Sequence, residues 1–273
     1  MPELQYTLKN DALFKVMFVK YPALLRDLVA KLLNLRPESI SDFVITNPEL
    51  TPEKIGGKFC RLDIHMLVDG QRVDIELQVE NEGDYPERVL YYWARSYSLA
   101  LSSGHHYAEL PRTVIISIIN FPLFDCEEFL SEFAPLEVTR HTRLSDRMGL
   151  YFFELRKLPA EISAEDGLKL WQALFKAETE EDLAKLKAME VPIMSQAVDA
   201  FHTITISPEF QELELMRSKA LHDEAQALHH ARLEGRLEER LETARNALLM
   251  NMPIEDIVKL TGFTREEVEN LRH

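Results

Sequence analysis

The sequence predicts an α/β protein with a mixed sheet flanked by helices and an α-helical C-terminal extension. Three observations predict this fold class. Residues 61 to 80 alternate apolar and polar side chains around Asp69-Gly70, as a hairpin of two half-buried strands does. Residues 112 to 121 form a continuous β-branched run, which is typical of a strand buried on both faces. Segments with helical periodicity precede, separate and follow these strands.

Composition limits the class of protein. The chain has 273 residues, 46% of them hydrophobic, which is enough for one core and an additional helical piece. Its 46 Asp and Glu against 31 Lys and Arg give a formal charge of −15. This charge argues against a surface that binds nucleic acid over a wide area, but not against a local nucleic-acid-binding site that contains metal ions. The longest apolar stretch, residues 114 to 124, is too short for a membrane helix of about 20 residues. Residues 1 to 15 show no signal-peptide pattern, and the two cysteines form neither a disulfide framework nor a zinc motif, so we expect a cytoplasmic protein that does not bind membranes.

Helix signals surround the expected strands. Residues 8 to 35 carry apolar side chains at helical spacing and predict one or two helices, the first capped by Asn10. A helix over residues 85 to 104 is expected from Pro86 near its start and Gly104 as its C-cap. The other expected elements are a strand over 148 to 158 and helices over 165 to 189, 192 to 204 and 209 to 249.

The C-terminal region differs in character from the rest. The expected parts are a core over 1–158, a helical extension over 159–208, and a long charged helix with a C-terminal helix pair over 209–273. Apolar steps of three and four along the long helix predict a seam for a partner, and we expect a homodimer through these C-terminal helices. The pair at 253–272 has a helix-turn-helix shape, with Thr264 and Glu267 as a capping box. Its second helix is acidic, so packing or partner binding is favoured over DNA reading.

The hairpin places two acids opposite each other. A two-residue Asp-Gly turn fixes the register so that residue 68 faces 71 and residue 64 faces 75. Asp63 then lies directly opposite Glu76, with Cβ atoms roughly 5 Å apart, and like charges placed in this way are destabilising.

Two interpretations of this acidic pair stay open. In the first, the hairpin is a solvated edge and neighbouring Arg and His side chains offset the acids. In the second, Asp63 and Glu76 hold Mg²⁺ or another divalent cation for hydrolysis of a phosphodiester. Gln78 lies on the same face, where its amide could orient a metal-bound water but could not supply positive charge.

The sequence resembles the Rpn family of recombination-promoting nucleases and transposases, within the PD-(D/E)XK nuclease superfamily. The resemblance covers most of the chain and rests on four segments, which read NDALFKVMF, RLDIHMLVDGQRVDIELQVE, PERVLYYWARSYSLALSSGHHYAELPRTVIISIINF and TGFTREEVENLR. It implies a restriction-endonuclease-like core and metal-dependent cleavage of DNA, with a link to recombination or mobile elements.

The resemblance also implies roles for individual residues. The superfamily places an Asp on one strand, then Glu or Asp, any residue and Lys on the next. Asp63 matches the first position and Glu76 the second, with Gln78 in place of the Lys, which leaves open the group that stabilises the attacking hydroxide. Asp11 matches the family's N-terminal acidic position, where it could complete the metal shell or be a charge favoured by the helix N-terminus. Arg88 could hold a phosphate or neutralise Glu76.

Other basic residues are weaker candidates. Arg88, Tyr92 and Arg95 share a helical face, although we expect a function for Arg88 only. Basic residues around the last expected strand form the best candidate for an edge that contacts phosphates: Arg140, Arg143, Arg147, Arg156 and Lys157.

An alternative function belongs to a different class. The chain could be a catalytically inactive, dimeric interaction or regulatory protein built on a nuclease fold. The acidic charge and the long charged helix suit this alternative.

Overall fold

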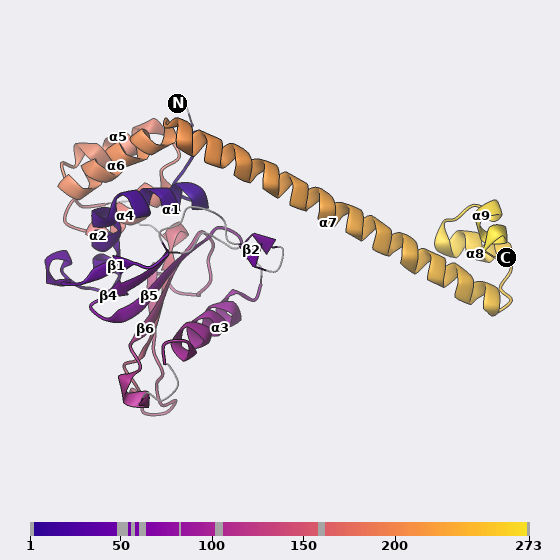
Figure 1. The fold of residues 1–273 in the computed structure, drawn as a ribbon, viewed down its shortest axis with the longest axis horizontal. Coiled ribbons are helices and arrows are strands. Elements are labelled where there is room, and N and C mark those ends of the chain that lie inside the picture. The colour runs from indigo at the N-terminus through magenta and orange to yellow at the C-terminus, as the bar shows by residue number, and fades with distance from the viewer. Residues whose placement is uncertain are drawn as a thin grey trace. The chain divides into compact units, whose positions relative to one another are not determined.

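The chain folds into two compact units, residues 1–211 and 212–273. The computed structural model describes residues 3–47, 54–55, 58–59, 64–81, 83–101, 106–157 and 162–271. The first unit contains a sheet with helices on both of its faces (Figure 1).

A six-stranded mixed sheet forms the centre of the first unit. Its strands, in spatial order, are β1 (Phe43–Ile45), β4 (Ile64–Val68), β5 (Gln71–Gln78), β6 (Thr113–Ile119), β8 (Met148–Glu154) and β7 (Leu130–Phe133). Strands β5, β6 and β8 run parallel, so their C-terminal ends meet at one edge, whereas β1, β4 and β7 pair antiparallel with their neighbours. A separate two-stranded ribbon joins β2 (Lys54–Ile55) and β3 (Lys58–Phe59).

The predicted hairpin register is confirmed for the residues that the structure describes. Val68 pairs with Gln71 and Ile64 pairs with Ile75 across β4 and β5. Asp69 and Gly70 both adopt positive φ angles, 47° and 75°, as a type I′ turn requires. Residue 63 lies outside the described residues, so its predicted pairing with Glu76 stays a prediction.

Helices cover the two faces of the sheet unequally. One face carries a layer containing α1 (Asp11–Lys20), α2 (Pro22–Leu32), α4 (Gly167–Lys176), α5 (Glu180–Ala188) and α6 (Pro192–Thr205), as Figure 1 shows. The other face carries α3 (Tyr85–Ser98). Tyr85 and Val89 of α3 pack on Ile115 of β6 and Phe152 of β8, and these residues belong to one buried cluster. Alternate residues of β6, such as Ile116, therefore face the larger helical layer.

The helix ends follow the predicted signals, with two exceptions. The residues expected to be helical from 165 to 189 form two helices, α4 and α5, because Thr179 caps a new helix by accepting a hydrogen bond from the Asp182 amide. The Asn10 side chain accepts a hydrogen bond from the Leu13 amide at 2.8 Å, which confirms the predicted cap of α1. The helix expected to reach Gly104 ends at Ser98, whose hydroxyl donates to the Arg95 carbonyl at 2.9 Å. Such a side-chain bond competes with the continuing helical ladder. Gly104 itself lies outside the described residues.

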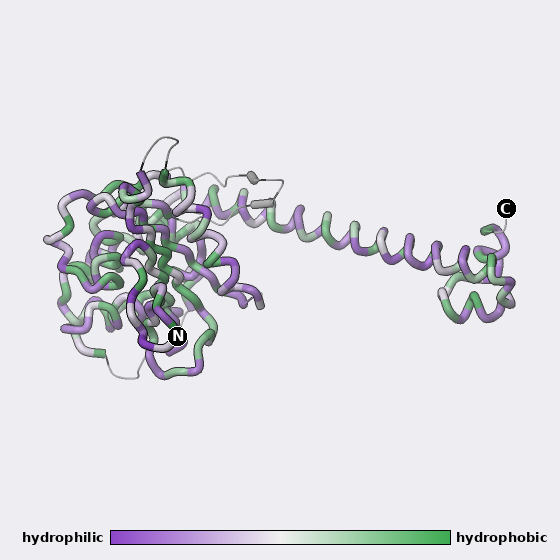
Figure 2. The backbone as a smooth tube through the Cα atoms, turned by 90° about the horizontal axis from the view of Figure 1, so that it is seen from below, coloured by the Kyte–Doolittle hydropathy of each residue, from purple (hydrophilic) through white to green (hydrophobic). Residues whose placement is uncertain are grey.

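The second unit contains most of α7 (Pro208–Leu249), with α8 (Ile254–Thr261) and α9 (Arg265–Asn270). Ile257, Phe263 and Val268 form a small core with Ala244 and Ala247 of α7. The predicted capping box of α9 is present, and the colouring of α7 alternates between hydrophilic and hydrophobic along its length (Figure 2). Within the described residues, no helix is both long and apolar enough to cross a membrane.

Candidate active site

A row of buried polar side chains runs along the central strand β5. Asp74, Glu76 and Gln78, called the polar row here, are only 9%, 5% and 1% exposed. Their parallel partners in β6 are Ile115, Ser117 and Ile119. Because paired residues of neighbouring strands point to the same face, the polar row faces the side of the sheet covered by α3.

The burial of Glu76 overturns the interpretation of the hairpin as a solvated edge. Strand β5 has β4 on one side and β6 on the other, so it is an interior strand. A carboxylate removed from water costs free energy unless it is paired, hydrogen-bonded or bound to a metal. Sequence alternation alone marks Glu76 as polar, but cannot reveal that α3 covers the polar face as well.

A histidine–aspartate pair adjoins Glu76. His65 of β4 faces Asp74, and its Nδ1 lies 2.7 Å from Asp74 Oδ1. This hydrogen bond is the largest cause that raises the pKa of His65 above its ordinary value. Burial opposes the rise, the charges of Asp74 and Glu76 add to it, and the charge of Lys15 lowers the pKa. The His65 side chain is 48% exposed, so its imidazole contacts both Asp74 of the polar row and solvent.

We expect the His65 imidazole to titrate above its ordinary pKa of 6.5 in the folded protein. Since the folded value is the higher one, the pair stabilises the fold fully below the unfolded pKa, and this contribution is lost as pH rises through the folded pKa. An NMR titration of the ring protons checks this, and Asp74→Asn should lower the observed value. Asp146→Asn, at an exposed acid, is the matched control; an equal change in both variants contradicts the assignment.

Gln78 does not occupy its position as a free amide. Its Oε1 accepts a hydrogen bond from Arg88 Nη2 at 2.8 Å, and its Nε2 donates to the Glu80 carbonyl at 2.6 Å. The Arg88 guanidinium also lies 4.9 Å from the centre of the Tyr85 ring, in cation–π geometry. The contact brings the predicted residues Gln78 and Arg88 together and ties the start of α3 to the end of β5.

Helix α1 contributes a lysine that sequence reasoning missed. Asp11 lies half-buried in the first turn of α1, and Lys15 follows one turn later with only 5% of its surface exposed. The Lys15 ammonium is close enough to influence the titration of His65, which also interacts with Glu76. The sequence does carry a signal for this lysine, because Lys15 is a charged residue between two apolar neighbours, Phe14 and Val16.

The described part of the site offers donors suited to a hard cation. Glu76 provides a buried carboxylate, and the Ser117 hydroxyl beside it is fully buried without a hydrogen-bond partner among the described residues. Mg²⁺ typically takes one or two protein carboxylates and several waters, so these donors fit it. Asp63, the other predicted ligand, lies outside the described residues, and no group of three potential metal ligands occurs within them.

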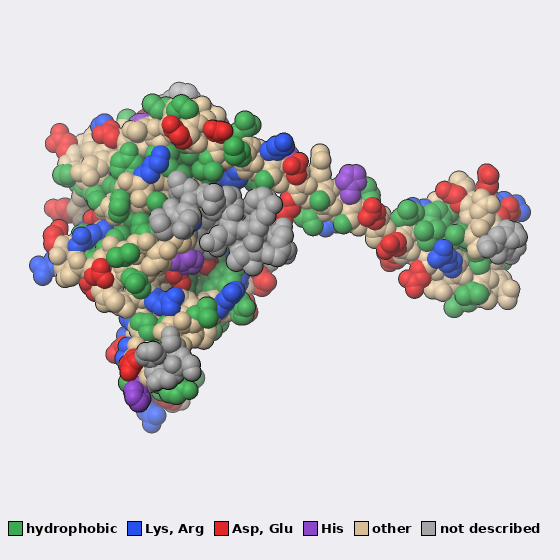
Figure 3. All heavy atoms as spheres, viewed as in Figure 1, with side chains coloured by type: hydrophobic (Ala, Val, Ile, Leu, Met, Phe, Trp, Pro, Cys, Tyr) green, Lys and Arg blue, Asp and Glu red, His purple; other side chains and the backbone are tan. Residues whose placement is uncertain are grey.

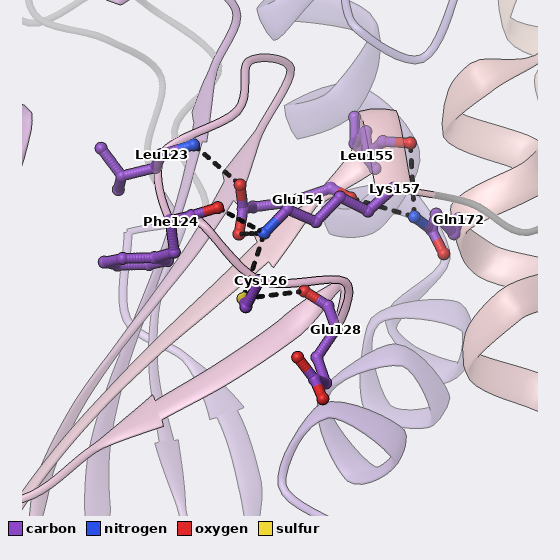
Figure 4. A network of polar contacts seen from close by, with 8 residues as sticks. All are labelled: Leu123, Phe124, Cys126, Glu128, Glu154, Leu155, Lys157 and Gln172. Carbon is purple, nitrogen blue, oxygen red and sulfur yellow. Dashed lines mark hydrogen bonds and ion pairs between the residues drawn. The ribbon is translucent and has the colours of Figure 1, made fainter.

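The basic cluster predicted as a phosphate-contacting edge is largely committed to internal contacts. Arg140 pairs with Glu137 and Arg143 with Asp146, both at the surface. Lys157 lies 2.6 Å from the buried carboxylate of Glu154 and points toward the loop that carries Cys126 (Figure 4). The sequence shows the positive charges but not which acidic side chains pair with them in the folded protein.

The sheet order, the helical layers and the buried acid on β5 define a restriction-endonuclease-like fold of the nuclease class. The family described as PD-(D/E)XK nuclease family transposase matches residues 8–231, so the chain belongs to this family. The matched segment includes α1, the polar row and α3. Comparison with curated proteins gives no match, and neither does comparison with solved structures.

Proposed function

We propose that the protein is a Mg²⁺-dependent endonuclease that hydrolyses DNA phosphodiester bonds at the polar row. The observation that carries this proposal is the buried carboxylate of Glu76 on an interior strand of the segment that the family matches. The sequence resemblance matches Glu76 to the superfamily's second acid. Asp63 and Glu76 would hold the ion, and Asp11 would assist them. A bound Mg²⁺ supplies an activated water and polarises the phosphodiester. The family's name supports a role in DNA recombination or mobile elements.

The hydrogen bonds of Gln78 indicate which residues position water and which supply positive charge. Gln78 is held in one orientation, because its side-chain oxygen accepts a hydrogen bond from Arg88 and its nitrogen donates one to the Glu80 carbonyl. In this orientation its amide group positions water. It cannot supply the positive charge of the lysine that other superfamily members place there. Arg88 supplies charge toward the phosphate from α3, and we propose that Lys15 supplies it near Glu76 from α1.

Replacing Lys15 with methionine should slow cleavage about a hundredfold, as removal of a preorganised charged donor commonly does. Methionine keeps the length of the side chain and suits a buried position, so the fold should persist. Lys20→Met, at the exposed end of the same helix, is the matched control. Cleavage at the wild-type rate by Lys15→Met, with unchanged metal affinity, contradicts the role.

The direct test of the proposed function is a plasmid-nicking assay with purified protein. Cleavage should require Mg²⁺ or Mn²⁺ and stop when the ion is chelated. Linear duplex, single-stranded DNA and RNA of one sequence, offered in parallel, would define the substrate. No cleavage of any of them with either ion would favour the inactive alternative.

The homodimer predicted for either function has one supporting observation. Leu221 and Leu228 of α7 are one heptad apart and are 49% and 65% exposed. Leu233 and Leu237 are also half-exposed. These leucines support a homodimer through the C-terminal helices, which suits an active nuclease that cuts two strands as well as an inactive protein.

A further inference from the structure

The outer surface of α3 exposes large apolar side chains. Tyr85 and Val89 are fully buried against the sheet, whereas Tyr91 is 61% and Leu99, just after the helix, 68% exposed. Tyr92 is 38% exposed and lies 6.1 Å from Tyr91, measured between ring centres. Exposed tyrosines on a rigid helix offer flat surfaces that a monomeric fold does not need.

These tyrosines belong to a stripe with arginines at helical spacing. Residues three, four and seven positions apart lie on the same side of a helix. The stripe consists of Arg88, Tyr91, Tyr92, Arg95 and Leu99. From Arg88 to Arg95 it extends about 10 Å, which matches about three nucleotides of a stacked strand.

The charge of the stripe contrasts with that of the whole chain. Acidic side chains are spread over the visible surface of each unit, in keeping with a formal charge of −15 (Figure 3). Arg95 is exposed and forms no ion pair among the described residues, unlike Arg140 and Arg143. A local positive field of this kind attracts a polyanion where the rest of the surface repels it.

The stripe is continuous with the candidate active site. Arg88, its first member, donates a hydrogen bond of 2.8 Å to Gln78, two residues after Glu76 on β5. A strand lying along the stripe would therefore end beside Gln78, the last member of the polar row. Alternating aromatic and cationic side chains are the combination by which proteins bind single strands independently of sequence.

We propose that this stripe binds single-stranded DNA, stacking bases on Tyr91 and Tyr92 and contacting phosphates through Arg95 and Arg88. The proposal deepens the proposed function by naming the substrate form that reaches the polar row, and it rests on that function for its biological meaning. It gives Arg95, for which the sequence suggested no function, a role in binding. Duplex DNA should bind more weakly, because paired bases cannot stack on the tyrosines.

The test measures binding without cleavage. The full-length protein is titrated in EDTA into a labelled oligothymidine of twelve nucleotides, and binding is followed by fluorescence anisotropy. Tyr91→Ala with Tyr92→Ala should weaken binding about tenfold or more, and the corresponding double change to phenylalanine should retain it. Arg95→Ala should also weaken binding and lower the slope of log affinity against log salt by about one. Tyr107→Ala, at an 84% exposed tyrosine outside the helix, is the matched control.

Three outcomes overturn the proposal. One is that the wild type binds oligothymidine no better than duplex, and another is that the double alanine variant binds as well as Tyr107→Ala. The third is that the double alanine change halves the protein's mass measured by light scattering, which would make the stripe a contact between two copies. The binding assay contains EDTA, so it measures binding of the oligonucleotide in the absence of cleavage. Loss of binding in this assay and loss of Glu76-dependent cleavage in the nicking assay are therefore separate results, and failure of one proposal leaves the other testable.

Discussion

Glu76→Gln should lower Mg²⁺-dependent cleavage about a thousandfold, because metal-assisted charge stabilisation is worth several kcal/mol and each 1.36 kcal/mol is a factor of ten in rate. The change removes one charged oxygen ligand and keeps the shape of the side chain. Glu76 is only 5% exposed, so glutamine leaves no cavity and relieves the burial of a charge. We therefore expect unchanged or slightly raised thermal stability together with the loss of activity.

Asp74→Asn is the matched control for this variant. It makes the same carboxylate-to-amide change two residues away, on the same strand and face, at an acid bound to His65. Calorimetric titration should show Mg²⁺ binding in the Asp74 variant and none in the Glu76 variant. Equal losses of cleavage in both would mean that the general negative charge of the row, rather than a ligand at Glu76, supports the reaction.

Local patterns in the sequence predict much of the first unit. The alternation around Asp69-Gly70 predicts both strands and their register, because a one-residue slip would turn apolar side chains such as Ile64 and Ile75 outward. The β-branched run gives β6, whose residues are buried on both faces. Asn10 and Thr264 mark helix starts because their side chains satisfy backbone amides locally.

The remainder depends on contacts between segments far apart in the chain. Strands β1 and β7 are three and four residues long, too short for a period to be read from them. The burial of Glu76 depends on β5 lying between β4 and β6 in a sheet with helices on both faces, and the place of Lys15 depends on how α1 packs. Neither follows from spacing along one element.

Lys157→Met should destabilise the first unit by about 3 kcal/mol or more, because it leaves the buried charge of Glu154 without its partner. The Glu154 side chain is fully buried, and its Oε2 lies 2.6 Å from Lys157 Nζ. Its Oε1 accepts a hydrogen bond from the Leu123 amide at 2.8 Å, and Lys157 donates to the Phe124 carbonyl at 2.9 Å. Burial lowers the pKa of Lys157, but its hydrogen bonds to Glu154 and Cys126 outweigh this and raise it. Urea unfolding followed by circular dichroism measures the effect.

A second change separates the buried charge from the other contacts of this network. Glu154→Gln added to Lys157→Met removes the unpaired charge while its amide oxygen still accepts from Leu123, so most of the lost stability should return. Arg143→Met breaks an ion pair whose side chains are 49% and 84% exposed, and should cost less than about 1 kcal/mol. If the double variant is as unstable as Lys157→Met alone, the lysine acts through its bond to the Phe124 carbonyl, and the pair with Glu154 contributes little. Recovery in the double variant would instead show that Lys157 is retained to neutralise Glu154, at the sheet edge where β5, β6 and β8 end together.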